Sequence, residues 1–177
     1  MKEVKVKDKV FTEFISKEEM NNIVTSIAKS VEAKFDGKNP IFLVMLNGAF
    51  VFASDFLRAL EHPYETLFVR YSSYSGMQTT GNVVTSAIPE VVKGRNVVIL
   101  EDIVDSGLTM EVFKKNLMKM KPESITLVAL LSKPSARKVD VKIDYVGKEI
   151  EDKFVVGYGL DYDGFGRNLP AIYVLKE

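Results

Sequence analysis

Residues suited to phosphate and metal chemistry are concentrated in one stretch, VVILEDIVDSGLTM, at positions 97–110. There an apolar run ends in the paired acids Glu101 and Asp102. A polar loop comes next, and its candidates for binding or catalysis are Asp105, Ser106, Gly107 and Thr109. A tight turn at the glycine leaves backbone N–H groups pointing inward, hydroxyls add donors, and the helix predicted next contributes its positive end. The stretch therefore predicts a loop that binds phosphate.

The paired acids need a partner of their own. Two carboxylates beside a phosphate repel it unless they face something else, and ribose hydroxyls or a Mg²⁺ ion are their natural partners. The alternative is a strand end capped by acids, with Asp105 or Ser106 as an ordinary helix N-cap. The occurrence of all these residues together, directly after so apolar a strand, favours a ligand-binding site over a capped strand end. Other phosphate motifs, GxxxxGK[ST] and a strand–helix GxGxxG, do not occur.

The elements that must position this loop alternate between buried strands and helices. A helix is predicted to open at Ser16, with Glu19 completing a capping box. Further helices are predicted over Val51–Leu60 and Thr109–Met120. Strands are predicted over Ile41–Leu46, Glu65–Tyr71, Asn82–Ile88, Asn96–Asp102 and Ser124–Leu131, with two short ones near Lys153–Tyr158 and Ala171–Leu175.

This alternation predicts an α/β protein with a mostly parallel central sheet. Ligands of such sheets bind at the carboxyl ends of the strands, which directs attention to the residues just after Leu46, Leu100 and Leu131. The segment SSYSGMQTTGN at 72–82 is rich in Ser, Thr and Gly and has no helical period, so we expect a mobile loop there. A plain hairpin connection is the alternative.

Composition sets the broad class. The chain has 177 residues, 46% apolar and 27% charged, which suits one domain over residues 1–177 and excludes a disordered or collagen-like chain. Formal net charge is zero, which argues against a nucleic-acid partner. The chain has no cysteine, and neither a signal core nor a spanning apolar run occurs in it, so we expect a cytoplasmic protein with no membrane partner.

The loop at 105–109 has the form D-[ST]-G-x-T, and with the acids before it the sequence resembles the type I phosphoribosyltransferases. LNGAF, SSYSG and KFVVGYGLDYDGFGRNLP make it most similar to members acting on hypoxanthine and guanine, from about Phe11 to Leu175. The resemblance implies the type I phosphoribosyltransferase fold. That fold has a central, mostly parallel sheet flanked by helices, a small hood near the C-terminus and a mobile lid loop.

The resemblance assigns roles for the donor, phosphoribosyl pyrophosphate. Glu101 and Asp102 hold the ribose hydroxyls directly or through Mg²⁺, and Asp105 is the general base or acid at purine N7. The 5′-phosphate lies on the loop made of Ser106, Gly107, Leu108 and Thr109. The pyrophosphate loop is Leu46, Asn47 and Gly48, which in the family often contains a non-proline cis peptide. Many members have a basic residue where this chain has Asn47, so one charge is missing from that loop.

Other residues are assigned to the base and the leaving group. Lys133, a donor only, suits the O6 carbonyl of a 6-oxopurine and not the amino group of adenine. A solvated lysine at a strand end is the alternative. Phe154 stacks on the base, and the backbone of Val155 reads its edge. The remaining assignments are Asp161 to the purine side and a second Mg²⁺, Arg167 and Arg137 to pyrophosphate, and Ser73 and Tyr74 to the lid.

The implied activity is transfer of the phosphoribosyl group from its pyrophosphate donor to N9 of hypoxanthine or guanine. Two alternatives stay open: a sister enzyme that prefers xanthine, and a regulator on the same fold that senses the donor and binds nucleic acid. The resemblance also implies a homodimer or homotetramer.

Overall fold

A five-stranded parallel sheet forms the centre of the protein. The computed structural model describes residues 2–70 and 88–176. In the order β4-β3-β5-β6-β7, the strands are Glu65–Arg70, Ile41–Leu46, Asn96–Val104, Ser124–Ser132 and Tyr145–Glu149. The strands predicted at 41–46, 96–102 and 124–131 are confirmed, and β5 and β6 extend further. The strand predicted at 65–71 is confirmed as far as Arg70.

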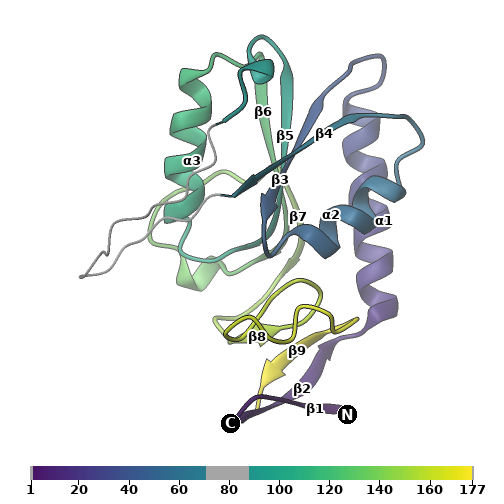
Figure 1. Ribbon diagram of the computed structural model, residues 1–177, viewed down its shortest axis with the longest axis vertical. Helices are drawn as coiled ribbons and strands as arrows, with labels where there is room; N and C mark the ends of the chain where they lie inside the picture. Colours follow the sequence, from purple (N-terminus) through teal and green to yellow (C-terminus); the bar gives the residue numbers. More distant parts are fainter. Residues whose placement is uncertain (1, 71–87, 177) are drawn as a thin grey trace.

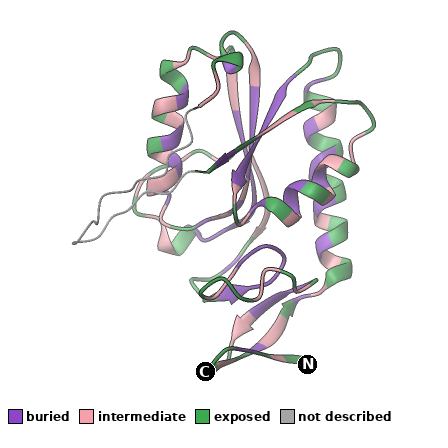
Figure 2. Ribbon diagram, in the orientation of Figure 1, coloured by how far each residue is buried: buried purple, intermediate pink, exposed green. Residues whose placement is uncertain are grey.

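Helices cover both faces of this sheet (Figure 1). Helices α1 (Lys17–Lys34) and α2 (Phe50–Arg58) lie on one face, and α3 (Leu108–Lys119) lies on the other. Short 3₁₀ turns occupy Glu90–Val92 and Pro134–Ala136. Because β3, β5 and β6 are covered on both sides, they are apolar on both faces, and Figure 2 shows the buried residues running along them. The predicted α/β class is therefore confirmed.

The predicted start of α1 is also confirmed. The Ser16 hydroxyl accepts a hydrogen bond from the Glu19 N–H at 3.1 Å. The Glu19 carboxylate does not return to complete the capping box and instead binds Lys148 Nζ at 2.7 Å. This ion pair joins the first turn of α1 to β7.

The hood is a second, antiparallel sheet with the order β1-β2-β9-β8. Its strands are Glu3–Val6, Lys9–Ile15, Ile172–Leu175 and Val155–Val156. The hood was predicted near the C-terminus, and the N-terminal hairpin that makes half of it was not predicted. Buried Phe11 and Tyr173 are the largest side chains of its own small core, which holds the two ends of the chain side by side (Figure 1).

Strand β7 was not predicted either, because YVGKE combines a glycine with two charges. A side chain at Gly147 would place its Cβ 2.5 Å from the Leu130 carbonyl oxygen and 2.8 Å from Ile23. The glycine therefore lets the edge of the sheet lie close against α1. The strand predicted at 82–88 and the loop at 72–82 fall, except for Ile88, outside the described residues. Within the described part of the chain, no helix is long and apolar enough to cross a membrane.

One carboxylate ties α1 to the turn between α2 and β4. Glu32 accepts hydrogen bonds from the backbone N–H groups of Glu61 and His62 at 3.0 Å, and its Oε1 lies 3.0 Å from His62 Nδ1. The Tyr64 hydroxyl donates to it at 3.3 Å. Burial alone raises the pKa of Glu32, but these hydrogen bonds together outweigh burial and hold the pKa below its usual value.

This arrangement predicts an acid-sensitive contribution to stability. Glu32→Ala should lower the free energy of unfolding at pH 7 by about 2 kcal/mol, since several bonds to one carboxylate are lost. The folded pKa is lowered, so the stabilisation is present above the unfolded pKa and disappears as pH falls through the folded value. Urea denaturation from pH 7 to pH 3 measures this, with exposed Glu61→Ala as control. A difference in unfolding free energy between Glu32→Ala and the parent that stays constant with pH would contradict this prediction.

Candidate functional site

The candidate site lies where β3, β5 and β6 end at one edge of the sheet. β3 and β5 pair in parallel, as do β5 and β6, so their carboxyl ends meet. Val104 is paired with Ser132 at the ends of β5 and β6, and the Lys133 N–H donates to the Val104 carbonyl at 3.0 Å. The acidic pair, the loop at 105–109 and Lys133 are therefore brought together by the sheet itself, as the carboxyl-end rule predicts.

Glu101 and Asp102 are neighbouring carboxyl groups, of which Asp102 is buried and Glu101 is half-buried. The pKa of Glu101 is raised well above its usual value by burial, by the charge of Asp102 and by the hydrogen bond it donates to Asp102. Burial also raises the pKa of Asp102, partly offset by the bond from Glu101, by backbone N–H groups and by the positive charge of Arg167. The pair is thus costly to ionise where it lies, and a cation or hydroxyl donors would relieve that cost.

These donors fit the Mg²⁺ that the resemblance implies. No group of three or more His, Cys, Asp or Glu side chains that could hold a metal ion occurs within residues 2–70 and 88–176. Mg²⁺ is commonly bound through one or two carboxylates, with substrate oxygens and waters as the other ligands. Glu101 and Asp102 would supply the protein's share.

The loop at 105–109 is shaped by Gly107, which precedes the first residue of α3. Its φ of 82° lies in the left-handed region that favours glycine. The Ser106 hydroxyl accepts from the Leu108 N–H at 3.4 Å, and the first-turn N–H groups of α3 open toward this edge. Beside Gly107 lies Arg137, whose Nη2 donates to Ser132 Oγ at 2.8 Å. Its Nη1 is buried with no hydrogen-bond partner among the described residues.

The loop after β3 lies directly against the acidic pair. The peptide bond between Leu46 and Asn47 is cis, as the resemblance predicts. A Cβ on Gly48 would lie 1.8 Å from Asp102 Oδ2, so only glycine leaves room for that carboxylate. Asn47 is exposed, and its Oδ1 accepts from Arg70 Nη2 at 3.1 Å. A guanidinium from the end of β4 therefore stands beside the loop position where a basic residue was expected.

A loop of the hood closes over the pyrophosphate loop from the other side. A Cβ on Gly159 would lie 2.0 Å from the Gly48 carbonyl oxygen. The Gly159 carbonyl accepts from Arg167 Nη1 at 2.7 Å, while Arg167 Nη2 pairs with Asp161 Oδ1 at 2.7 Å. The other oxygen of Asp161 accepts from the Gly164 N–H at 2.6 Å. Asp161 therefore fixes its own turn and holds Arg167. If it also bound a metal ion, the ion would share its two carboxylate oxygens with these contacts.

The residues assigned to the base lie on the hood side of the same edge. Lys133 is buried and paired with Asp105 and Asp152, so it is not a solvated lysine at a strand end. Phe154 is 44% exposed and packs edge-on against Tyr162, with ring centroids 5.9 Å apart, which leaves part of the ring free to stack. Val155 is buried in β8, paired with Val174 of β9. Ser73 and Tyr74, predicted for the lid, lie outside the described residues.

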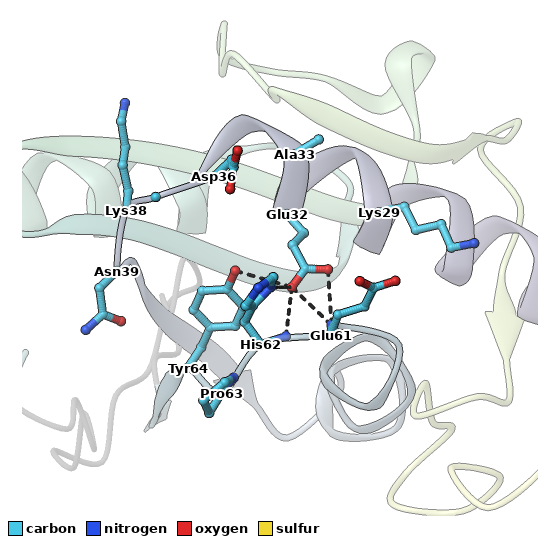
Figure 3. Close-up of a pocket in the computed structure, with 11 residues that line it drawn as sticks. Lys29, Glu32, Ala33, Asp36, Lys38, Asn39, Glu61, His62, Pro63 and Tyr64 are labelled. Atoms are coloured by element: carbon cyan, nitrogen blue, oxygen red, sulfur yellow. Dashed lines mark hydrogen bonds and ion pairs between the residues drawn. The ribbon is translucent and has the colours of Figure 1, made fainter.

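A separate pocket lies beyond the opposite edge of the sheet (Figure 3). It is lined by the end of α1 and by the turn before β4, with Glu32, His62 and Tyr64 pointing toward one another. Its residues precede β3 and β4 in the chain, so it opens at the amino ends of these strands. None of the predicted site residues lines it. His62 is engaged with Glu32 in this turn, away from the acidic pair.

Three residues of the site were missed from the sequence. Arg70 ends β4, which is parallel to β3, so the carboxyl-end rule could have found it. Asp152 comes after β7, and it was overlooked because that strand was not predicted. The third is Tyr158, whose hydroxyl donates to Asp55 Oδ2 at 2.5 Å and thus joins the hood to α2. No sequence pattern pairs these two residues.

The chain is similar in sequence and in structure to known phosphoribosyltransferases. The family model described as the phosphoribosyl transferase domain matches residues 12–163. A hypoxanthine-guanine phosphoribosyltransferase of Bacillus subtilis is 40% identical, covering 92% of this chain and 91% of its own. A hypoxanthine-guanine-xanthine phosphoribosyltransferase of Tritrichomonas foetus is 35% identical, covering 100% and 98%. A crystal structure of a hypoxanthine-guanine phosphoribosyltransferase from Bacillus anthracis has a TM-score of 0.84 at 36% identity, covering 99% of each chain.

The bond between Tyr158 and Asp55 should stabilise the junction of hood and sheet. Burial and the Asp55 carboxylate both raise the pKa of Tyr158, in keeping with a hydroxyl that stays protonated and donates. Tyr158→Phe keeps the buried ring and should lower the free energy of unfolding by about 1 kcal/mol in urea denaturation. Asp55→Asn keeps an acceptor oxygen and should lower it less. Equal stability of Tyr158→Phe and the parent would show that the bond adds nothing.

Proposed function

Because the chain belongs to the phosphoribosyltransferase family, we propose that it converts a free purine into a nucleotide. It transfers the phosphoribosyl group of 5-phosphoribosyl 1-pyrophosphate to hypoxanthine or guanine, releasing pyrophosphate and giving IMP or GMP. The chain is thus a purine-salvage enzyme of the pentosyltransferase class, and its substrates are small molecules.

The observation that carries this function is the convergence of three recognition elements at one edge of the sheet. The acidic pair ends β5, the loop at 105–109 opens α3, and Lys133 comes directly after β6 with its backbone bound to Val104. The acidic pair suits ribose hydroxyls, the loop suits a phosphate, and Lys133 suits the 6-oxo group of a purine. A nucleoside monophosphate carries all three.

The reaction can be derived from these positions. The bond from the anomeric carbon to pyrophosphate breaks ahead of the new bond to purine N9, so positive charge develops on the ribose. The negative charge shared by the Glu101–Asp102 pair stabilises the cation, and the guanidinium of Arg167 neutralises the departing pyrophosphate. Asp105 accepts or shares the N7 proton of the purine. Mg²⁺, when bound by Glu101 and Asp102, supplies further neutralisation of the pyrophosphate.

Selection of the base rests on Lys133. Its buried ammonium has donors only, so it binds the O6 carbonyl of hypoxanthine or guanine and opposes the amino group of adenine. Phe154 offers an exposed ring edge and face for stacking. Xanthine is a second candidate base, because the relative from Tritrichomonas foetus is named for it. Homodimer or homotetramer formation and a cytoplasmic location stay predictions.

Direct assay tests the proposed function. Purified protein is incubated with donor, Mg²⁺ and each of hypoxanthine, guanine, xanthine and adenine, and nucleotide formation is monitored. Conversion of hypoxanthine and guanine, without conversion of adenine, is expected. Nucleotide formation from none of the 6-oxopurines, by protein with native unfolding behaviour, would overturn the proposal. A much faster reaction with xanthine would reassign the base and leave the reaction class unchanged.

Asp105→Asn tests the role of the N7 base. Because the carboxylate acts on the purine during the chemical step, the variant should lose about 100-fold or more in kcat. Its KM for the donor should change far less, since the loop amides at 105–109 remain. Steady-state kinetics with each substrate varied in turn separate the two effects. Equal losses in kcat and donor affinity would argue against a role as base.

Arg70→Gln tests whether Arg70 replaces the basic residue missing at Asn47. The charge beside the pyrophosphate loop is removed, so the KM for the donor should rise by about five- to tenfold, while the KM for hypoxanthine stays unchanged. Arg58→Gln is the matched control, because Arg58 lies on α2 with a largely exposed side chain. An unchanged donor KM in Arg70→Gln would remove Arg70 from the site.

A further inference from the structure

The ammonium of Lys133 is shared between two carboxylates. Its Nζ lies 3.2 Å from Asp105 Oδ2 and 3.3 Å from Asp152 Oδ1. The lysine side chain is 8% exposed, whereas those of Asp105 and Asp152 are 51% and 62% exposed. A buried ammonium needs such partners, and this one has an acid on each side.

Only one of the two acids has a part in the proposed reaction. In the proposed reaction Asp105 acts at N7 of the purine, so it must release the ammonium, at least in part, when the base enters. If Asp105 were its only partner, the lysine ammonium would then lose its one anionic contact when it bound O6. Asp152 is a second anion that can keep the ammonium charged and in place while Asp105 turns to the base.

The backbone bond two residues before Asp152 ties its segment to the end of β6. Asp152 lies just beyond β7, where the Ile150 N–H donates to the Ser132 carbonyl at 2.9 Å. Lys133 is the next residue after Ser132 in the chain. Two residues after Asp152 comes Phe154, assigned to stacking. The ion pair therefore joins the segment that reads O6 to the segment that stacks on the ring.

The charged residues on either side of Asp152 are engaged with each other. Glu151 and Lys153 form an ion pair at 2.8 Å, and the side chain of Glu151 is 76% exposed. Glu151 therefore provides a control one position away, with the same type of charge directed to a different lysine.

We propose that Asp152 is a positioning residue for purine recognition, holding the Lys133 ammonium over the base while Asp105 is released for N7. The inference rests on the proposed function. Asp152 touches the lysine and not the reacting atoms, so its effect falls on base affinity. Donor binding, which rests on the acidic pair and on the N–H groups of the loop at 106–109, is expected to change little.

Asp152→Asn tests the proposal by steady-state kinetics. The KM for hypoxanthine should rise about five- to tenfold, the loss expected when a charged hydrogen-bond partner becomes neutral. The donor KM should stay within about twofold, because the variant leaves the phosphate loop intact. Asp152→Glu should recover most of the affinity, and Glu151→Gln should match the parent. A hypoxanthine KM unchanged in Asp152→Asn, or raised equally in Glu151→Gln, would overturn the proposal.

A double-mutant cycle with Lys133→Met shows whether Asp152 acts through the lysine. Binding of GMP is measured by calorimetry, which requires no turnover and serves every variant. Asp152→Asn should weaken GMP binding in the parent and have no further effect in the Lys133→Met background. Equal weakening in both backgrounds would overturn the positioning role. Failure of the unmodified protein to make IMP would instead reject the proposed function, so the two failures are distinguishable.

Discussion

Two neighbouring carboxyl groups, half-buried Glu101 and buried Asp102, lie together near the end of the central strand, and the rest of the site is arranged around them. Burial of such a pair is unfavourable, which is why the pKa values of both groups are raised. Strand β5 holds them there because its apolar residues are fixed between β3 and β6. A ligand that supplies a cation or hydroxyl donors to the pair removes this cost on binding, which makes the pair a natural centre for a sugar and a metal ion.

The surroundings of the pair come from segments far apart in the chain. Gly48 leaves room for the Asp102 carboxylate, and Gly159 of the hood in turn packs on the Gly48 carbonyl. The hood loop is held by the bond between Tyr158 and Asp55 and by the contacts of Arg167 with Asp161 and Gly159. The position of the hood therefore sets the distance between the pyrophosphate loop and the base-reading residues. Stability and recognition share the same contacts here.

Much of the central sheet could be predicted because its strands are buried on both faces. Continuous apolar runs such as Ile41–Leu46 stand out in the sequence, and their carboxyl ends direct attention to the site. Strand β7 and the N-terminal hairpin could not be found this way, since charged residues interrupt their apolar ones and most of their residues are only partly covered. Because β7 was not predicted, Asp152, which lies just after it, was not recognised as a site residue. Pairings made in three dimensions, such as Arg70 with Asn47, leave no local pattern, although the end of β4 was accessible to the carboxyl-end rule.

The central claim is that the turn after the acidic strand accepts the phosphate of a nucleotide whose ribose faces Glu101 and Asp102. A crystal structure of the protein grown with GMP tests it most directly. We expect phosphate oxygens within hydrogen-bond distance of the N–H groups at 106–109, the ribose hydroxyls toward the acidic pair and the base against Phe154. A nucleotide bound elsewhere, for instance in the pocket beside Glu32 and His62, with the turn at 106–109 empty, would contradict it.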